Sequence, residues 1–207
     1  MMDEVQWQLR PLLKEHGFRM RSRTCNRTSA DGLIHVVNFQ MGRYDPPGTY
    51  EIPGLRENLY GKFTVNVGIY VPEIARLRLG KITSDFAQEV DCCIRQRLGH
   101  LAGGSDLWWN LPASDSTVAD LRLRIERDAL PFLANHEDRT AVLRQLETAA
   151  HVTGGPPRIS RAIILAHRGE IEQARKLLRE QIRSASGEHV RHVQDIADLL
   201  NLGRLES

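Results

Sequence analysis

The segment from Phe63 to Tyr70 (FTVNVGIY) constrains the fold most, because its residues alternate in polarity. Apolar side chains stand at positions 63, 65, 67 and 69, and polar or small residues stand between them. Since successive side chains of a strand point to opposite faces of its sheet, this pattern predicts a half-buried β-strand. We expect the apolar set to line the core, and Thr64 and Asn66 to face away from it.

Three further segments have the composition of strands. Leu33 to Met41 is rich in β-branched and aromatic residues and follows the turn signal Asp31-Gly32. Before that turn, residues 18–23 alternate apolar or small with basic residues, which predicts a strand with three arginines on one face, and residues 25–28 predict a short partner strand. Residues 83–98 fit both helical spacing and alternation, and we favour a strand over 90–98.

Helical spacing dominates the two ends of the chain. Residues 3–16 predict a helix that Gly17 ends and that Pro11 kinks or restarts. From Ser116 onward, helical patterns cover 116–133, 138–149, 160–168, 171–183 and 188–201. Proline and glycine mark a long loop over 42–58 and a linker over 153–157.

Together these segments predict an α+β protein in two parts. Residues 1–135 would form an antiparallel sheet of about four to five strands with flanking helices. Residues 136–207 would form a C-terminal helical hairpin or bundle, which either docks on the first part or forms a homodimer contact.

Charge and cysteine content narrow the functional classes. The 28 Lys and Arg residues nearly balance the 26 Asp and Glu residues, so the net charge of +2 does not by itself indicate nucleic-acid binding. The three cysteines, with Cys92 and Cys93 adjacent, fit reduced thiols better than disulfides or a zinc site. Neither a signal peptide nor a membrane-spanning stretch is evident. We expect a cytoplasmic protein without membrane segment, metal or cofactor.

The polar side of the predicted sheet is the first candidate binding surface. If the long strands share one sheet, alternation aligns Gln40 and Asn66 with Arg95 and Arg97. Arginine can grip a carboxylate or a phosphate with two hydrogen bonds, and amides add directional ones. This face would recognise a polar ligand or a protein. The alternative is a structural surface whose arginines pair internally with Glu89, Asp91 or Asp106.

The adjacent Trp108 and Trp109 extend that candidate surface. In an extended segment one ring turns toward the core and the other turns outward, where it can anchor a partner. Packing of both rings in the core is the alternative.

A basic stretch near the N-terminus is the second candidate. Arg19, Arg21, Arg23 and Arg27 follow Arg10 and Lys14, with Glu15 as the acidic residue among them. These cations could receive an anion, and a solvated charged face is the alternative.

Several motifs occur in a distinctive order along the chain. They are Gly17-Phe18, Arg27, Phe39-Gln40, Phe63-Thr64-Val65-Asn66-Val67-Gly68, the segment Cys93 to Gly99, and Asp106-Leu107-Trp108-Trp109. Over roughly residues 5–133 this order resembles a bacterial family described as a domain of unknown function, number 4304. The resemblance implies an α+β domain with some similarity to small proteins thought to be immunity partners of secreted toxins.

These observations favour a non-enzymatic, bacterial, immunity-like protein that docks a protein partner through the polar sheet face. Binding of nucleic acid or another polyanion through the N-terminal arginines is one alternative. An enzyme that uses Asp91, Arg95, Asp106 or His100 beside the tryptophans is another. No motif supports catalysis, since there is no nucleophile elbow or phosphate-binding loop, and the pair His189 and His192 lacks further metal ligands.

Overall fold

The computed structural model describes residues 2–42, 50, 52, 58–80, 86–148 and 156–205 of the 207-residue chain. Most of the predicted loop over 42–58 and of the predicted linker over 153–157 lies outside these residues. The chain divides into two compact units. The first comprises Met1–Arg27, His35–Gly68 and Gln96–Asn135, and the second comprises Thr28–Ile34, Ile69–Arg95 and His136–Ser207. The second unit thus combines the C-terminal helices with two earlier segments, and the division into residues 1–135 and 136–207 stays a prediction.

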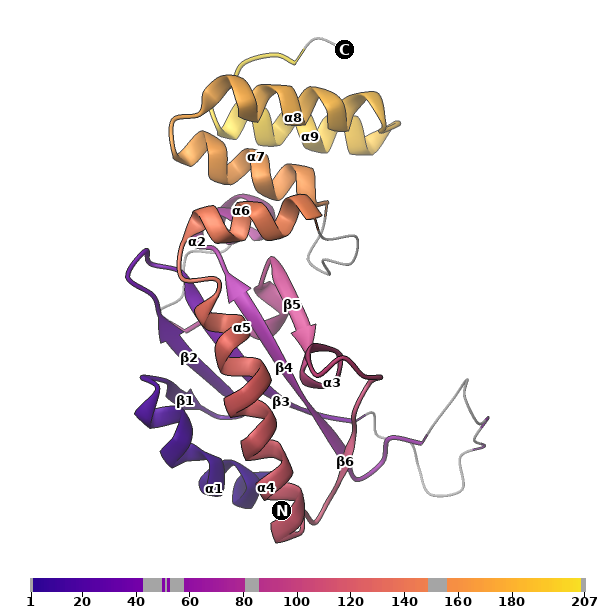
Figure 1. Ribbon diagram of the computed structural model, residues 1–207. Coiled ribbons are helices and arrows are strands. Elements are labelled where there is room, and N and C mark those ends of the chain that lie inside the picture. The colour runs from indigo at the N-terminus through magenta and orange to yellow at the C-terminus, as the bar shows by residue number, and fades with distance from the viewer. Residues whose placement is uncertain are drawn as a thin grey trace. The chain divides into compact units, whose positions relative to one another are not determined.

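A sheet forms the centre of the α+β part, and Figure 1 shows its strands. Their order is β1-β2-β3-β4-β5, and β6 pairs with β4. The strands are β1 Arg19–Arg21, β2 Thr24–Thr28, β3 Ile34–Met41, β4 Lys62–Tyr70, β5 Ile94–Arg97 and β6 Trp109–Asn110. Met20 lies opposite Cys25 in the antiparallel pair β1 and β2, and Phe63 lies opposite Trp109 in the antiparallel pair β4 and β6. The predicted α+β fold with an antiparallel sheet is confirmed.

Strand β4 is buried on both faces, which corrects the predicted orientation of its polar side chains. The apolar residues from Phe63 to Ile69 are fully buried as expected, but Thr64 is 0% exposed and Asn66 is 3% exposed. The Asn66 amide donates a hydrogen bond of 2.7 Å to Gln40 Oε1 on β3, which satisfies this polar group inside the protein. The alternating sequence therefore reflects a difference in polarity between the two faces of β4 and not a difference in exposure, because both faces are covered.

The segment before β5 turns sharply, so the strand predicted over 90–98 is too long. Glu89–Asp91 forms a 3-10 turn, η1, and β5 begins at Ile94. Val90, expected in the strand, is 67% exposed, and the short helix α3 (Leu98–Leu101) follows directly. The turn brings Glu89 back to Arg95, whereas six residues of continuous strand would separate the two by about 20 Å.

The N-terminal helix α1 (Met2–Glu15) runs without interruption through Pro11, so the predicted restart does not occur. Its buried side includes Val5, Leu9 and Leu12, while Pro11 lies on the exposed side. Gly17 ends the helix with φ of 81°, and the Phe18 N–H then bonds to the Leu13 carbonyl.

The hairpin after α1 corrects the predicted row of three arginines. β1 ends at Arg21, and Ser22 has a positive φ of 53° at the turn into β2. Arg23 therefore lies in this turn rather than on the strand. Arg19 and Arg21 keep the two-residue spacing that places both on one side of β1.

The helix predicted from Ser116 is longer and is capped at a different residue. Ser114 is its N-cap, because the Thr117 N–H donates to the Ser114 hydroxyl at 3.2 Å. The helix continues from α4 (Asp115–Arg124) through a π-turn, η2 (Ile125–Ala129), into α5 (Leu130–Ala134). Pro131 follows the π-turn at the start of α5, so the wider turn accommodates its ring and the helix does not end there.

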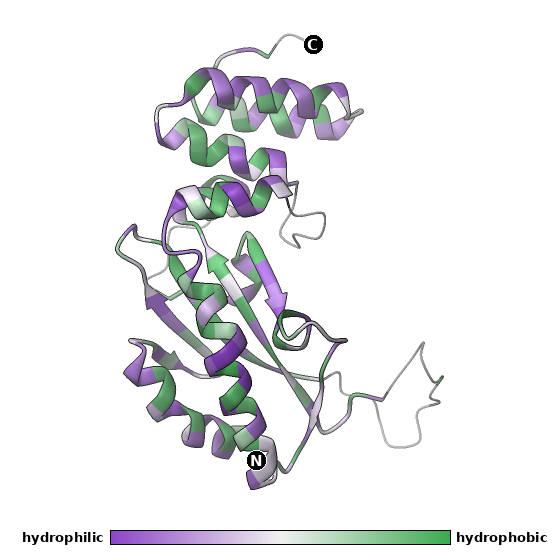
Figure 2. Ribbon diagram, in the orientation of Figure 1, coloured by the Kyte–Doolittle hydropathy of each residue, from purple (hydrophilic) through white to green (hydrophobic). Residues whose placement is uncertain are grey.

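In the second unit, α7 (Pro157–His167) contacts α2 (Pro72–Leu79), α6 (Arg139–Thr148) and α8 (Ile171–Arg183). Helix α9 (Glu188–Leu199) packs on α8 and α2. Figure 2 shows much of α7 in the hydrophobic colour, whereas α8 is largely hydrophilic. The predicted C-terminal helical region is confirmed. Within the described residues, none of the helices combines the length and the apolar character needed to cross a bilayer.

The start of α6 is held by a group of charged residues, in which Glu73 is buried and Asp31 is exposed. Arg139 donates from Nε and Nη2 to both carboxylate oxygens of Glu73 at 2.7 and 2.9 Å. Asp31 accepts from the Arg139 backbone N–H at 2.8 Å and forms a further ion pair with its guanidinium at 3.0 Å. These bonds connect α6, α2 and the β2–β3 turn inside the second unit, so Arg139 is a structural residue.

Candidate anion-binding site

The predicted binding arginine Arg95 has a partner inside the protein. Its Nε and Nη2 donate to the two Glu89 carboxylate oxygens at 2.7 and 2.9 Å. Glu89 is buried, and its hydrogen bond raises the pKa of Arg95. The turn η1 positions this carboxylate. The geometry of Arg95 therefore fits the alternative prediction, in which the arginine pairs with a carboxylate of the same chain.

Arg97 belongs to a second group with its own carboxylate. Arg97 Nη1 donates to Asp106 Oδ2, and Trp108 Nε1 donates to the same oxygen at 3.0 Å. The Arg97 guanidinium also lies 5.0 Å from the centre of the Trp108 ring, within cation–π range. Burial raises the pKa of Asp106, but the hydrogen bonds from Arg97 and Trp108 outweigh it and hold that pKa below its usual value. Asp106 therefore remains a carboxylate at neutral pH, which does not suit a general acid.

Trp108 and Trp109 are both half-buried, so the prediction that one ring is buried and the other exposed is wrong. Trp109 Nε1 donates to Asp120 Oδ2 at 3.1 Å, and its ring lies 5.8 Å from that of Phe63. Arg124 holds the same Asp120 at 2.9 and 3.0 Å. Each indole N–H is thus occupied by a carboxylate of the protein, and each indole keeps part of its ring in solvent.

The N-terminal cations differ from Arg95 and Arg97. We call the exposed residues Arg10, Lys14, Arg19, Arg21 and Arg23 the basic surface. Among the described residues, none of its members has an ion-pair partner. Glu15 is the acidic residue within this stretch. The positive charge of the basic surface is therefore available to an anion from outside.

Arg27, the fourth arginine of the predicted anion site, is not part of this surface. It is half-buried, its guanidinium lies 5.6 Å from the centre of the Phe18 ring, and its Nη2 lies 2.8 Å from His35 Nδ1. These contacts engage it inside the first unit.

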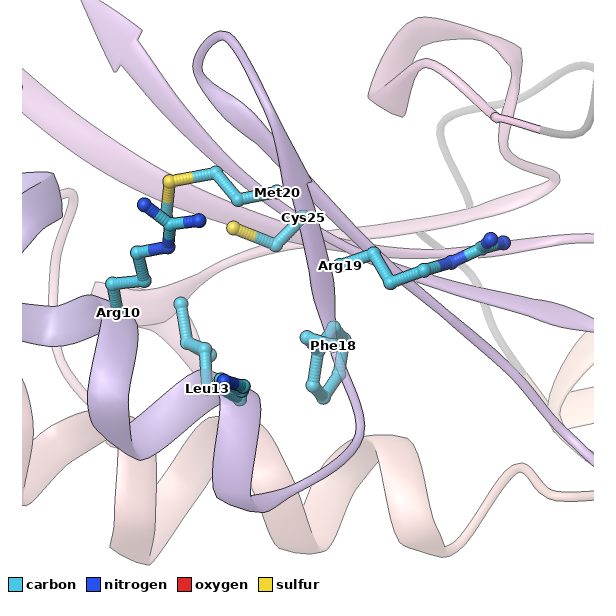
Figure 3. A pocket seen from close by; sticks show the side chains of 7 residues that line it. Arg10, Leu13, Phe18, Arg19, Met20 and Cys25 are labelled. Atoms are coloured by element: carbon cyan, nitrogen blue, oxygen red, sulfur yellow. The ribbon is translucent and has the colours of Figure 1, made fainter.

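Two hollows border α1 and share Arg10 and Lys14. The first, the basic pocket, has a volume of about 240 Å³ and is lined by Arg10, Leu13, Lys14, Phe18, Arg19, Met20 and Cys25. Figure 3 shows Arg10 reaching from α1 toward Met20 and Cys25, whereas the Arg19 guanidinium points away from Arg10. The second hollow, of about 590 Å³, is lined by Trp7, Gln8, Arg10, Pro11 and Lys14. Arg10 and Lys14 are one helical turn apart on α1, and both line each of the two hollows.

The chemistry of the basic pocket suits binding rather than reaction. Burial raises the pKa of Cys25 to about 12, so its thiol stays protonated and is a poor nucleophile at neutral pH. Within the described part of the chain, no group of three His, Cys, Asp or Glu residues could hold a metal ion. The pocket offers positive charge at α1 and apolar side chains from Leu13, Phe18 and Met20.

Sequence reasoning found the cations of this site but not its pocket. The spacing of Arg10 and Lys14 could have placed both on one helix face. The apolar lining arises because Phe18, Met20 and Cys25 come from the chain that returns along α1, and only the folded hairpin brings them to Leu13.

The comparison with protein families places part of this fold in a known group. Residues 54–135 match the model of the family described as Domain of unknown function (DUF4304), which confirms the predicted family over a shorter span than the predicted residues 5–133. No curated protein and no solved structure matches the chain. Arg97, Asp106 and both half-buried tryptophans lie inside the matched segment, whereas the basic pocket lies before it.

Proposed function

We propose that this chain is a non-enzymatic binding protein that recognises an anionic partner through the basic surface. The observation that carries the proposal is the set of exposed cations of the basic surface, of which Arg10, Lys14 and Arg19 line the basic pocket and none has an ion-pair partner in the described part of the chain. Neighbouring cations repel one another, and an anion brought by a partner would relieve that repulsion. Complementary charge also accelerates encounter and disfavours partners of the wrong sign.

The predicted polar sheet face has weaker support as the main binding surface. Arg95 and Arg97 already bond to Glu89 and Asp106, and Asn66 is buried against Gln40. A partner on this face would compete with those bonds. The exposed parts of Trp108 and Trp109 could still add contact area beside Arg97.

The proposal includes a bacterial, cytoplasmic, immunity-like role as one form of such binding. An immunity protein acts by forming a stoichiometric complex, which requires a recognition surface and no chemistry of its own. The three cysteines are free and buried, in keeping with a reducing compartment. Products of neighbouring genes are the first partners to test by co-purification, and the absence of a stoichiometric complex with any of them would contradict the immunity-like role.

Labelled polyanions test the binding itself. We expect single-stranded RNA, single-stranded DNA or polyglutamate to bind at low ionic strength and to dissociate as salt rises, because salt screens exposed charges. The double variant Arg10→Gln with Lys14→Gln should weaken this binding about tenfold or more.

A matched control removes the same amount of charge elsewhere. Arg183 and Arg191 are exposed on α8 and α9, and neither has an ion pair among the described residues. Arg183→Gln with Arg191→Gln should leave binding unchanged. An equal loss in both double variants would show that net charge alone matters, and no binding of any polyanion at low salt would refute the proposed function.

A further inference from the structure

The basic pocket has a chemical character that a bare anion would use only in part. Its cations come from α1, but Leu13, Phe18, Met20 and Cys25 supply an apolar lining. Leu13, Phe18 and Cys25 are already buried, and Met20 is half-buried. A phosphate or a lone carboxylate would pair with Arg10 and Lys14 and leave Met20 partly in water. An apolar side chain that enters the pocket would remove the exposed part of Met20 and its own apolar surface from water, which contributes roughly 25 cal/mol per Å².

The second hollow combines the same two cations with other apolar side chains. Trp7 is 68% exposed there, and Pro11 lies next to Arg10 along the lining. Tryptophan is enriched among the residues that dominate binding energy in protein interfaces. An anion at Arg10 and Lys14 would therefore lie next to apolar side chains in either hollow.

From these two hollows we infer that the partner is a protein segment in which an apolar side chain stands next to acidic ones. The apolar side chain enters the basic pocket, and the flanking carboxylates pair with Arg10 and Lys14. This inference rests on the proposed function and names its partner. A nucleic acid matches the lining less well, because its backbone offers phosphates but no apolar side chain, and the net charge of +2 is small for a polyanion-binding chain.

Three probes of the full chain separate these partners. The first is a labelled peptide with one leucine between glutamates, the second is the same peptide with serine in place of leucine, and the third is single-stranded RNA of equal charge. We expect the leucine peptide to bind most tightly, about tenfold better than the serine peptide, because a buried leucine side chain contributes about that factor. Its binding should also change the fluorescence of Trp7, and Trp7→Phe should abolish that change.

The variant Met20→Gln tests the pocket without altering charge. Met20 is half-buried, so the amide should be tolerated, and a thermal melt checks the fold. We expect Met20→Gln to lower affinity for the leucine peptide to that of the serine peptide and to leave RNA binding unchanged. Arg10→Gln with Lys14→Gln should weaken all three probes.

Three other results of these experiments would contradict the inference or the proposed function. Equal affinity for the leucine and serine peptides would overturn the apolar part of the inference. Tighter binding of RNA than of the leucine peptide would overturn the protein partner and retain the proposed anion binding. Failure of all three probes to bind at low salt would overturn the proposed function itself.

Discussion

Two strands of this protein carry the same pattern, arginine at both ends of a three-residue segment, with opposite outcomes. In β5, Arg95 and Arg97 each bond to a carboxylate of the same chain, Glu89 and Asp106. In β1, Arg19 and Arg21 are exposed and have no ion pair within the described residues. The pattern predicts a shared side of a strand in both cases, and the surrounding backbone determines whether the charge is neutralised.

The difference originates in the segments that flank each strand. A turn before β5 returns Glu89 to Arg95, and the loop after α3 returns Asp106 to Arg97. Strand β1 follows Gly17 and Phe18 and precedes the turn at Ser22 and Arg23. None of these flanking residues carries a carboxylate. Arginines with internal partners stabilise the fold, and those without them are available for recognition. Substitution of each kind of arginine should therefore have a different cost in stability.

The largest loss is expected for Arg139→Met, which removes the most enclosed guanidinium among these pairs. Its partner Glu73 is buried and would keep a charge without a counterion. We expect the free energy of unfolding to fall by about 3 kcal/mol, measured by urea denaturation. Arg127→Met is the control, because Arg127 is exposed beside Asp128, and we expect its cost to be much smaller than that of Arg139→Met. Equal costs for the two variants would contradict this ranking.

Arg95→Gln should have the next largest effect. The substitution leaves the buried Glu89 carboxylate with a weaker neutral donor, which we expect to cost about 2 kcal/mol in the free energy of unfolding. The affinity for the leucine peptide should stay within twofold of the wild-type value, which corresponds to about 0.4 kcal/mol in binding free energy. A variant that keeps its stability but loses binding of the peptide would show that Arg95 contributes to recognition.

Asp106→Asn should cost about 0.5 to 1 kcal/mol at neutral pH, because the ion pair with Arg97 is partly exposed. The pKa of Asp106 is lowered in the folded protein, so its contribution is present above the unfolded pKa of about 3.9 and is lost as pH falls through the lower folded pKa. The stability difference between wild type and variant should therefore be constant near neutral pH and shrink below about pH 4. A difference that grows with acidification would show that Asp106 is not the stabilising partner.

Much of the fold could be predicted from local patterns. Helix α8 lies where helical spacing placed it, and β4 and β3 occupy their predicted segments. Helix α8 and β4 have a strong periodicity, and β3 has the β-branched and aromatic composition of a strand, so local pattern and packing agree in these elements.

The errors arose where distant contacts decide the local conformation. Thr64 and Asn66 look like exposed residues in an alternating strand, but the sheet is covered on that face as well. The turn at Glu89 exists together with its bond to Arg95, which alternation over 90–98 does not reveal. The basic pocket likewise needs Leu13 of α1 beside Met20 and Cys25, and each comes from a different element.

The smallest effect on stability is expected for the double variant Arg19→Gln with Arg21→Gln. Both side chains are exposed on one side of β1 and have no carboxylate to lose in the described structure. Their removal relieves a weak repulsion, so we expect the free energy of unfolding to change by less than about 0.5 kcal/mol, toward greater stability. Urea denaturation at low and at high salt measures this, and the gain should vanish at high salt because salt screens the repulsion. In the same variant, the affinity for the leucine peptide should fall by less than in the double variant Arg10→Gln with Lys14→Gln, because the Arg19 guanidinium points away from Arg10 (Figure 3). A loss of more than about 1 kcal/mol would mean that β1, like β5, holds its arginines for stability, and the contrast between the two strands would disappear.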